Sequence, residues 1–240
     1  MLARTDDLTD AEKYLCEAKS FDNCIEVSIA EAFLFSQKDN KAAALTTLAN
    51  INSPASRSAG LMIVAHHEGQ EAAFQWLIDT NVDISDLDAE GKYFLLSQQI
   101  DACVWGDVKK SAEKISQQDL EEAPVLNHML AVTWLSPVVP EELHSVVLHQ
   151  LPFNASEFPL ASDVNSLEAR KKSQNFFVDA SKAAEQLNCP RAAGIDQDYA
   201  LWLELRDQDN SQKGRQYLEE KLRDPSSALR LVPLALQFGI

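Results

Sequence analysis

Residues 54–80 of this 240-residue chain read PASRSAGLMIVAHHEGQEAAFQWLIDT, and they limit the fold more than any other stretch. Small and apolar residues predict one helix over 57–67 and a second helix over 71–78. Only the polar residues 68–70 separate the two. Because so short a link makes two helices fold back on each other, we expect an antiparallel helical hairpin here.

Similar hairpins recur along the chain. Apolar residues at helical spacing, such as Ile25, Ile29, Ala32, Phe33 and Ser36 on one face of 24–37, predict most of the further helices. These cover 10–18, 24–37, 41–50, 89–105, 108–116, 120–135, 140–151, 164–187, 195–205, 211–222 and 226–237. The breaks near Asp39, Glu68, Gly106 and Pro137 lie roughly 30 to 40 residues apart, and a period of about 20 to 50 residues indicates stacked repeats. We expect Ala44, Leu48, Ala73 and Leu77 to pack between neighbouring hairpins.

The segments DNKAAALTTL, EGQEAAFQWL and GDVKKSAEKI each combine a polar turn with small residues and then a large apolar residue. In this pattern the chain resembles the tetratricopeptide-like family of α-solenoids, over roughly 20–151 and 196–222. The resemblance implies an all-α fold of stacked antiparallel hairpins in a right-handed superhelix, with a groove that binds protein. It implies no individual binding residues. The alternative is an irregular helical repeat array or a non-repetitive all-α fold.

The segment LPFNASEFPLAS at 151–162 has two Pro and no helical period, so it marks a domain boundary. We expect an N-terminal helical-hairpin repeat region at 1–151, a linker at 152–162 and a C-terminal helical region at 163–240. Residues 229–240 are strongly apolar, whereas the last helix of a solenoid normally has a polar outer face. We therefore expect the C-terminal region to be truncated from a longer protein and to self-associate through 229–240. The alternative is that this helix is wrapped inside its own domain.

Charge excludes one class of partner. The chain holds 37 Asp and Glu against 21 Lys and Arg, a formal net charge of −16, which repels phosphate backbones. Nucleic acid is therefore not an expected partner. Between His67 and Val125 there are 13 acidic residues and 4 Lys. We expect a protein or a basic peptide segment to bind this surface, through Glu68, Glu71, Asp79, Asp101, Asp107, Glu113, Glu121 and Glu122. A solvated acidic face that aids solubility is the alternative.

Nothing in the sequence indicates a membrane span, and the start MLARTDDLTD lacks the basic and apolar regions of a signal peptide. We therefore expect a cytoplasmic protein. If a signal peptide has been removed, the protein is instead periplasmic or secreted. Cys16 and Cys24 flank a predicted turn. They are either small buried residues in a reducing compartment or, in an exported protein, a disulfide.

Motifs for chemistry are sparse. The segment HHEGQE at 66–71 resembles a zinc-protease motif, but the residue four positions after His67 is Glu71 and Gly69 interrupts the helix. The chain has no Gly-rich phosphate loop. We therefore predict no catalytic residue, no cofactor and no metal. A Ser-His-Asp or Cys-His arrangement assembled from distant residues stays open, because a single sequence does not show which residues meet.

The predicted function is a protein–protein interaction scaffold or adaptor that uses a concave helical-repeat surface, without enzymatic activity. The alternative is an all-α enzyme or small-ligand-binding domain with a site in the helical interior. A pocket lined by convergent ionisable side chains with shifted pKa values would favour the alternative.

Overall fold

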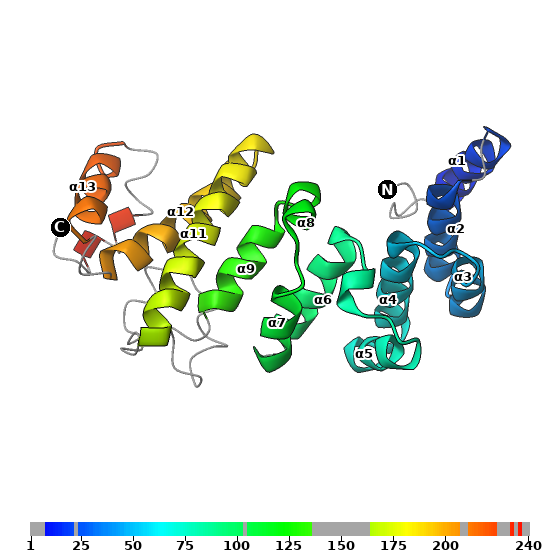
Figure 1. Ribbon diagram of the computed structural model, residues 1–240. Helices are drawn as coiled ribbons and strands as arrows, with labels where there is room; N and C mark the ends of the chain where they lie inside the picture. The colour runs from blue at the N-terminus through cyan, green and yellow to red at the C-terminus, as the bar shows by residue number, and fades with distance from the viewer. Residues whose placement is uncertain are drawn as a thin grey trace. The chain divides into compact units, whose positions relative to one another are not determined.

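A computed structural model of the chain describes residues 8–21, 24–102, 105–135, 164–206, 211–224, 231–232 and 235–236. Within them all regular structure is helical, which confirms the all-α fold class (Figure 1). The helices up to residue 101 are α1 (Leu8–Phe21), α2 (Ile25–Gln37), α3 (Lys41–Leu48), α4 (Pro54–Glu68), α5 (Gln70–Asp79), the 3-10 helix η2 (Ile84–Asp86) and α6 (Ala89–Asp101). Those that follow are α7 (Trp105–Ala112), α8 (Gln117–Glu122), α9 (Leu126–Leu135), α11 (Val164–Gln186), α12 (Pro190–Arg206) and α13 (Ser211–Lys221). No described helix is long and apolar enough to cross a membrane.

The chain forms two compact units that divide between Gln98 and Gln99, inside α6. We call residues 1–98 unit 1 and residues 99–240 unit 2. The predicted linker at 152–162 lies outside the described residues. The domain bounds 1–151 and 163–240 therefore stay predictions.

Unit 1 is a stack of interlocking hairpins. Helix α2 pairs with α3, and α4 pairs with α5, as Figure 1 shows. Helix α4 also packs against both helices of the preceding hairpin, and α1 packs against α2. The buried residues where the hairpins meet are Ala32, Ala44, Leu48, Ala59 and Ile63. The prediction that Ala44 and Leu48 pack between hairpins is confirmed, and the packing is consistent with a helical repeat array.

Two glycines of unit 1 lie where helices approach closely. A Cβ atom on Gly60 would lie 2.9 Å from two ring atoms of Trp76, and one on Gly91 would lie 2.1 Å from Ser58 Oγ. The hydroxyl of Ser58 is buried, and its oxygen accepts a hydrogen bond of 3.2 Å from the Asp88 amide. Glycine therefore sets the contact of α4 with α5, and that of α4 with α6.

A single residue joins α4 to α5. Gly69 ends α4 and caps α5, with φ 87° and ψ 179°, a conformation that is essentially restricted to glycine. The predicted hairpin is confirmed, with a link shorter than 68–70.

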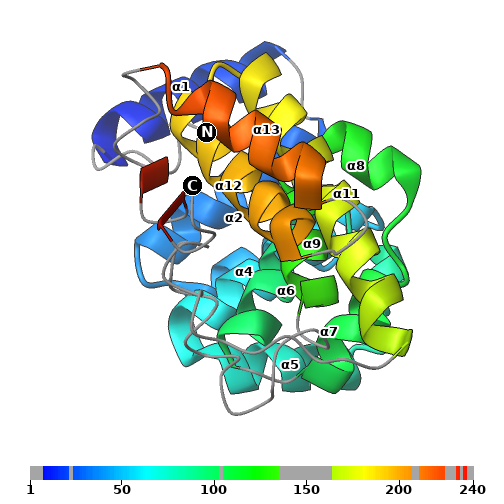
Figure 2. The same ribbon diagram turned by 90° about the vertical axis from the view of Figure 1, so that its left-hand side faces the viewer.

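Unit 2 is built around α11, which packs against both α9 and α12, while α12 packs against α13 (Figure 2). Its core holds fully buried Trp202, Phe177, Leu203 and Leu218. The rings of Phe177 and Tyr199 are stacked, with centroids 4.8 Å apart. Helix α11 matches the helix predicted over 164–187.

The predicted break at Gly106 is wrong. The helix predicted over 89–105 ends at Asp101, and α7 begins at Trp105, so Gly106 and Asp107 lie in the first turn of α7. Helix amides are unpaired in a first turn, so an acidic residue such as Asp107 is favourable there. A polar Gly-Asp pair can therefore begin a helix instead of ending one.

The single helix predicted over 120–135 is also wrong. The structure has two helices, α8 and α9, with a turn between them at 123–125. Pro124 lies in that turn, and proline removes a helical hydrogen bond and clashes with the preceding turn. Pro124 therefore accounts for the interruption.

Part of the apolar C-terminal segment belongs to the core of unit 2. Leu231 and Ala235 are buried in that core, whereas Val232 and Leu236 are 42% and 73% exposed. The rest of 229–240 lies outside the described residues, as do the helix predicted over 140–151 and residues 207–210. Self-association through 229–240 stays a prediction.

Candidate functional site

The eight acidic residues of the predicted partner surface are all exposed. Unit 1 carries Glu68, Glu71 and Asp79, and unit 2 carries Asp101, Asp107, Glu113, Glu121 and Glu122. Three of these residues thus belong to unit 1 and five to unit 2, and their role in binding stays a prediction.

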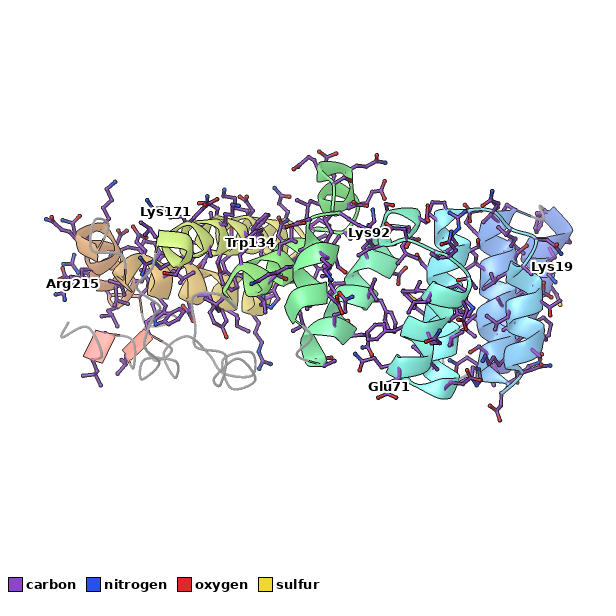
Figure 3. The ribbon with its side chains drawn as sticks, turned by 60° about the horizontal axis from the view of Figure 1, so that its bottom comes forward. Lys19, Glu71, Lys92, Trp134, Lys171 and Arg215 are labelled. Atoms are coloured by element: carbon purple, nitrogen blue, oxygen red, sulfur yellow. The ribbon has the colours of Figure 1, made fainter. Side chains whose placement is uncertain are left out.

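Four of these carboxylates have partners nearby in the chain or the fold. Glu68 forms an ion pair with Lys41 at 2.5 Å, and Asp107 forms one with Lys110 at 3.2 Å. Asp79 and Glu122 each accept a hydrogen bond from a glutamine side chain four residues earlier in the same helix. Among the described residues, the other four form no ion pair or hydrogen bond; Glu71 points away from the ribbon in Figure 3. The unpaired four are the stronger candidates for contact with a basic partner.

Unit 1 brings a serine, a histidine and an aspartate together. The Ser36 hydroxyl lies 3.0 Å from Nε2 of His67, and the Asp39 carboxylate lies 3.4 Å from Nδ1 of the same ring. With its Nδ1 proton toward Asp39, the imidazole accepts a hydrogen bond from Ser36. This is the atom order of a serine-hydrolase triad.

The surroundings of this group argue against catalysis. Ser36 is 3% exposed, so a substrate has little access to its oxygen. The amides of residues 38–40, which follow Ser36, all donate to carbonyl groups of residues 34–36. These amides are therefore not available to stabilise an oxyanion, which needs amide donors that point at it. The group instead joins the hairpins α2/α3 and α4/α5.

Unit 2 holds a second buried polar group. Nδ1 of His128 lies 2.7 Å from the Asp196 carboxylate, which is 6% exposed, while His128 is 33% exposed. Burial, and then the charge of Asp196, raise the pKa of the Tyr199 phenol well above its usual value. A carboxylate that holds one ring nitrogen leaves the other nitrogen of His128 as a candidate acid, base or ligand.

An apolar groove runs between α1 and α2 of unit 1. We call it the α1–α2 groove; its volume is about 180 Å³. It is lined by Ala11, Tyr14, Leu15, Ala18, Glu26, Val27, Ala30 and Leu34. Tyr14 is 46% exposed at this groove, and Phe21, which continues its helical stripe by way of Ala18, is 89% exposed. Glu26 is the one charged lining residue. Hydrogen bonds from the Cys24 side chain and from its own amide lower the pKa of Glu26.

A second groove of about 270 Å³ crosses α11, α12 and α13 in unit 2. Val178, Ala200 and Leu201 supply apolar lining, and Gln174, Ser181, Lys182, Glu185, Gln197, Glu204 and Tyr217 supply polar lining. A hydrogen bond of 2.8 Å from Gln197 to Glu185 joins α12 to α11 there. We call it the α11–α12 groove. Ser181 is 4% exposed, and its hydroxyl has no hydrogen-bond partner among the described residues.

No metal site is evident in the described part of the chain, where no three His, Cys, Asp or Glu side chains gather in a suitable cluster. Cys16, Cys24 and Cys189 are free thiols. Cys16 is exposed and Cys24 is half-buried, so neither is the small buried residue that one prediction expected. The pair forms no disulfide in this structure.

Comparison with known proteins finds no matching family model, no matching curated protein and no matching solved structure.

The sequence did contain a signal for the α1–α2 groove, which the predictions missed. Helix α2 carries the predicted stripe through Ile29 and Ala32, and a second apolar stripe through Val27, Ala30 and Leu34. A helix that is apolar on two sides needs a neighbour on both.

Proposed function

We propose that this chain is a protein–protein interaction module, a scaffold or adaptor of the tetratricopeptide-like kind, that binds a segment of a partner protein. The observation that carries the proposal is the α1–α2 groove, an open apolar surface at one end of the hairpin stack of unit 1. We propose no catalysis, and we expect the module to act in the cytoplasm.

The size and lining of the groove support a protein segment as the ligand. Pockets for drug-sized molecules usually measure about 300 to 1,000 Å³, and the α1–α2 groove, at about 180 Å³, is smaller. Exposed aromatic side chains such as Tyr14 and Phe21 are common anchors at protein interfaces.

Charge supports a basic partner. Glu26 lines the groove, and Glu71 lies in the same unit without a partner among the described residues. The chain as a whole carries a net charge of −16. Exposed charges are screened over about 8 Å at physiological ionic strength, so binding should weaken as salt is added. Binding that does not depend on salt would remove the acidic residues from the proposal.

Selection from an unbiased displayed peptide library, with the full chain as bait, tests the proposed function. We expect enriched peptides that carry Lys or Arg, and loss of their binding when Ala30→Phe fills the groove. Ala42→Phe, the same change at an exposed site on α3, is the matched control. A library that yields no binder, or binders indifferent to Ala30→Phe, would rule out the groove as the interaction site.

A second candidate function, binding of a small ligand by unit 2, rests on Ser181. Ser181 lines the α11–α12 groove, and its hydroxyl forms no hydrogen bond among the described residues, so it can pair with a bound ligand. A ligand that binds only the folded state raises the melting temperature. The test is a thermal-shift screen of polar metabolites. The candidate requires a compound that stabilises the native chain but not the Ser181→Ala variant.

A further inference from the structure

The contacts of α4 and α2 show how helices pack side by side in unit 1. Helix α4 packs against α3, the second helix of the hairpin before it, and α2 packs against α1. Helix α4 also packs against the first helix before it, which is α2. Among the described residues, α2 has no corresponding first helix before it. Helix α1 therefore packs on α2 as α3 packs on α4.

The faces of α2 identify which side of the helix lines the α1–α2 groove. Ala32, Ile29 and Phe33 pack in the cluster shared with α3 and α4. Val27, Ala30 and Leu34 lie on a different side of α2 and line the α1–α2 groove. The α1–α2 groove is therefore open to a helix that lies beside α1 and α2 together, as α2 lies beside α3 and α4.

We propose that the α1–α2 groove binds one amphipathic α-helix of a partner protein, which packs against α1 and α2 together. This rests on the proposed function and specifies the conformation and chemistry of the partner segment. Binding of an amphipathic helix in an apolar groove is an established mode of recognition.

The groove lining defines the face of the helix that binds. Three of its residues, Ala11, Ala18 and Ala30, are small, so a helix backbone can come close, as α4 and α6 do at Gly91. The bound helix needs apolar residues at i, i+4 and i+7 toward the groove. It also needs Lys or Arg toward Glu26, whose exposed carboxylate is the only charge in the lining.

Charge favours a different protein over a second copy of this chain. A symmetric contact uses the same patch on both copies. It would bring Glu26 of one groove toward Glu26 of the other, and like charges oppose such a contact. A helix with a basic flank meets Glu26 without that cost.

Synthetic helices test the inference directly. The probes are stapled peptides of 14 residues, the length of α1, with Leu at i, i+4, i+7 and i+11. One has Lys along the flank of the apolar face, a second has Glu at the same positions, and a third is the Lys peptide unstapled with two central prolines. Fluorescence anisotropy with the full chain should give the Lys helix an affinity at least about tenfold above either of the others.

Variants of the chain locate the binding. Ala30→Phe on one wall and Ala18→Phe on the other should each weaken the Lys helix at least about tenfold, while Ala42→Phe should not. Glu26→Lys should reverse the preference toward the Glu helix. Glu71→Lys, which changes an exposed carboxylate outside the groove, should not reverse it. Circular dichroism checks that each variant folds.

The outcomes separate this inference from the proposed function. If library peptides bind and depend on Ala30, yet the proline peptide binds as well as the Lys helix, the interaction module stands and the helical partner is wrong. If neither library peptides nor helices respond to Ala30→Phe, both proposals fail. If sedimentation shows a dimer that Ala30→Phe converts to a monomer, the occupant is a second copy, and the partner helix is overturned.

Discussion

His67 shows how one side chain can resemble catalytic chemistry and yet stabilise the fold. It gives the buried Ser36 hydroxyl its hydrogen-bond partner, at 3.0 Å. Leaving a buried polar group unpaired costs about 1 to 3 kcal/mol. We therefore expect His67→Ala to lower the free energy of unfolding by that amount in urea denaturation. His66→Ala, at the exposed neighbouring position, is the matched control. Equal effects of the two changes would mean that the hydrogen bond contributes nothing.

Tyr199 makes stability depend on alkaline pH. Burial and the charge of Asp196 raise its pKa above the ordinary value of 10.0. The folded chain thus keeps a phenol proton that the unfolded chain loses, so this contribution is complete below pH 10 and falls as pH rises above it. Through Tyr199, the free energy of unfolding falls by at most about 1.4 kcal/mol per pH unit. In urea denaturation between pH 8 and 11, Tyr199→Phe should lose stability less steeply than the native chain. Equal slopes would contradict this, and Tyr14→Phe controls for loss of a phenol elsewhere.

At the scale of helices and links, Gly69 is a position where the backbone conformation disfavours any other residue. Its φ of 87° with ψ near 180° is costly for any other residue, by about 1 to 3 kcal/mol. Gly69→Ala should therefore lower the melting temperature. Gly106→Ala should raise it slightly, because Gly106 lies in the helix α7, where alanine is the better former, and has open space around it. If Gly69→Ala and Gly106→Ala shift the melting temperature in the same direction, this account of Gly69 is wrong.

The helices could be predicted from the sequence wherever local signals decide their ends. The breaks at Asp39 and Gly69 follow from polar residues, and both residues adopt positive φ in the structure. The break near Gly106 could not be placed, because the same Gly-Asp pair can begin a helix as well as end one. Pro124 is a local signal against one continuous helix over 120–135.

The candidate site was harder to predict than the helices. Its alanines look like ordinary core residues, and only the packing of the helices reveals which apolar stripe lines a groove. The acidic surface is indicated by composition alone, and composition does not tell which carboxylates are already paired, as Glu68 is with Lys41. Ser36, His67 and Asp39 meet only through the contact between hairpins.

At the scale of the whole molecule, two compact units predict two unfolding transitions. Leu61 is fully buried in unit 1, and Leu203 is fully buried in unit 2. Truncation of a buried leucine to alanine typically costs about 2 to 5 kcal/mol. In differential scanning calorimetry, Leu61→Ala and Leu203→Ala should each lower the temperature of a different transition. If both changes move one shared transition, the chain unfolds as a single cooperative unit.

The buried Ser58 hydroxyl makes one amide a natural probe of local opening in unit 1. The Asp88 amide stands at the start of α6, where helix amides normally have no intrahelical partner and exchange their protons with water quickly. Here it donates to Ser58 Oγ on α4 at 3.2 Å, so exchange requires α4 and the beginning of α6 to separate. In deuterium exchange followed by NMR, the Asp88 amide should be protected in the native chain and should exchange freely in Ser58→Ala. The free energy obtained from its protection would be the cost of parting those two helices while the rest of the chain stays folded.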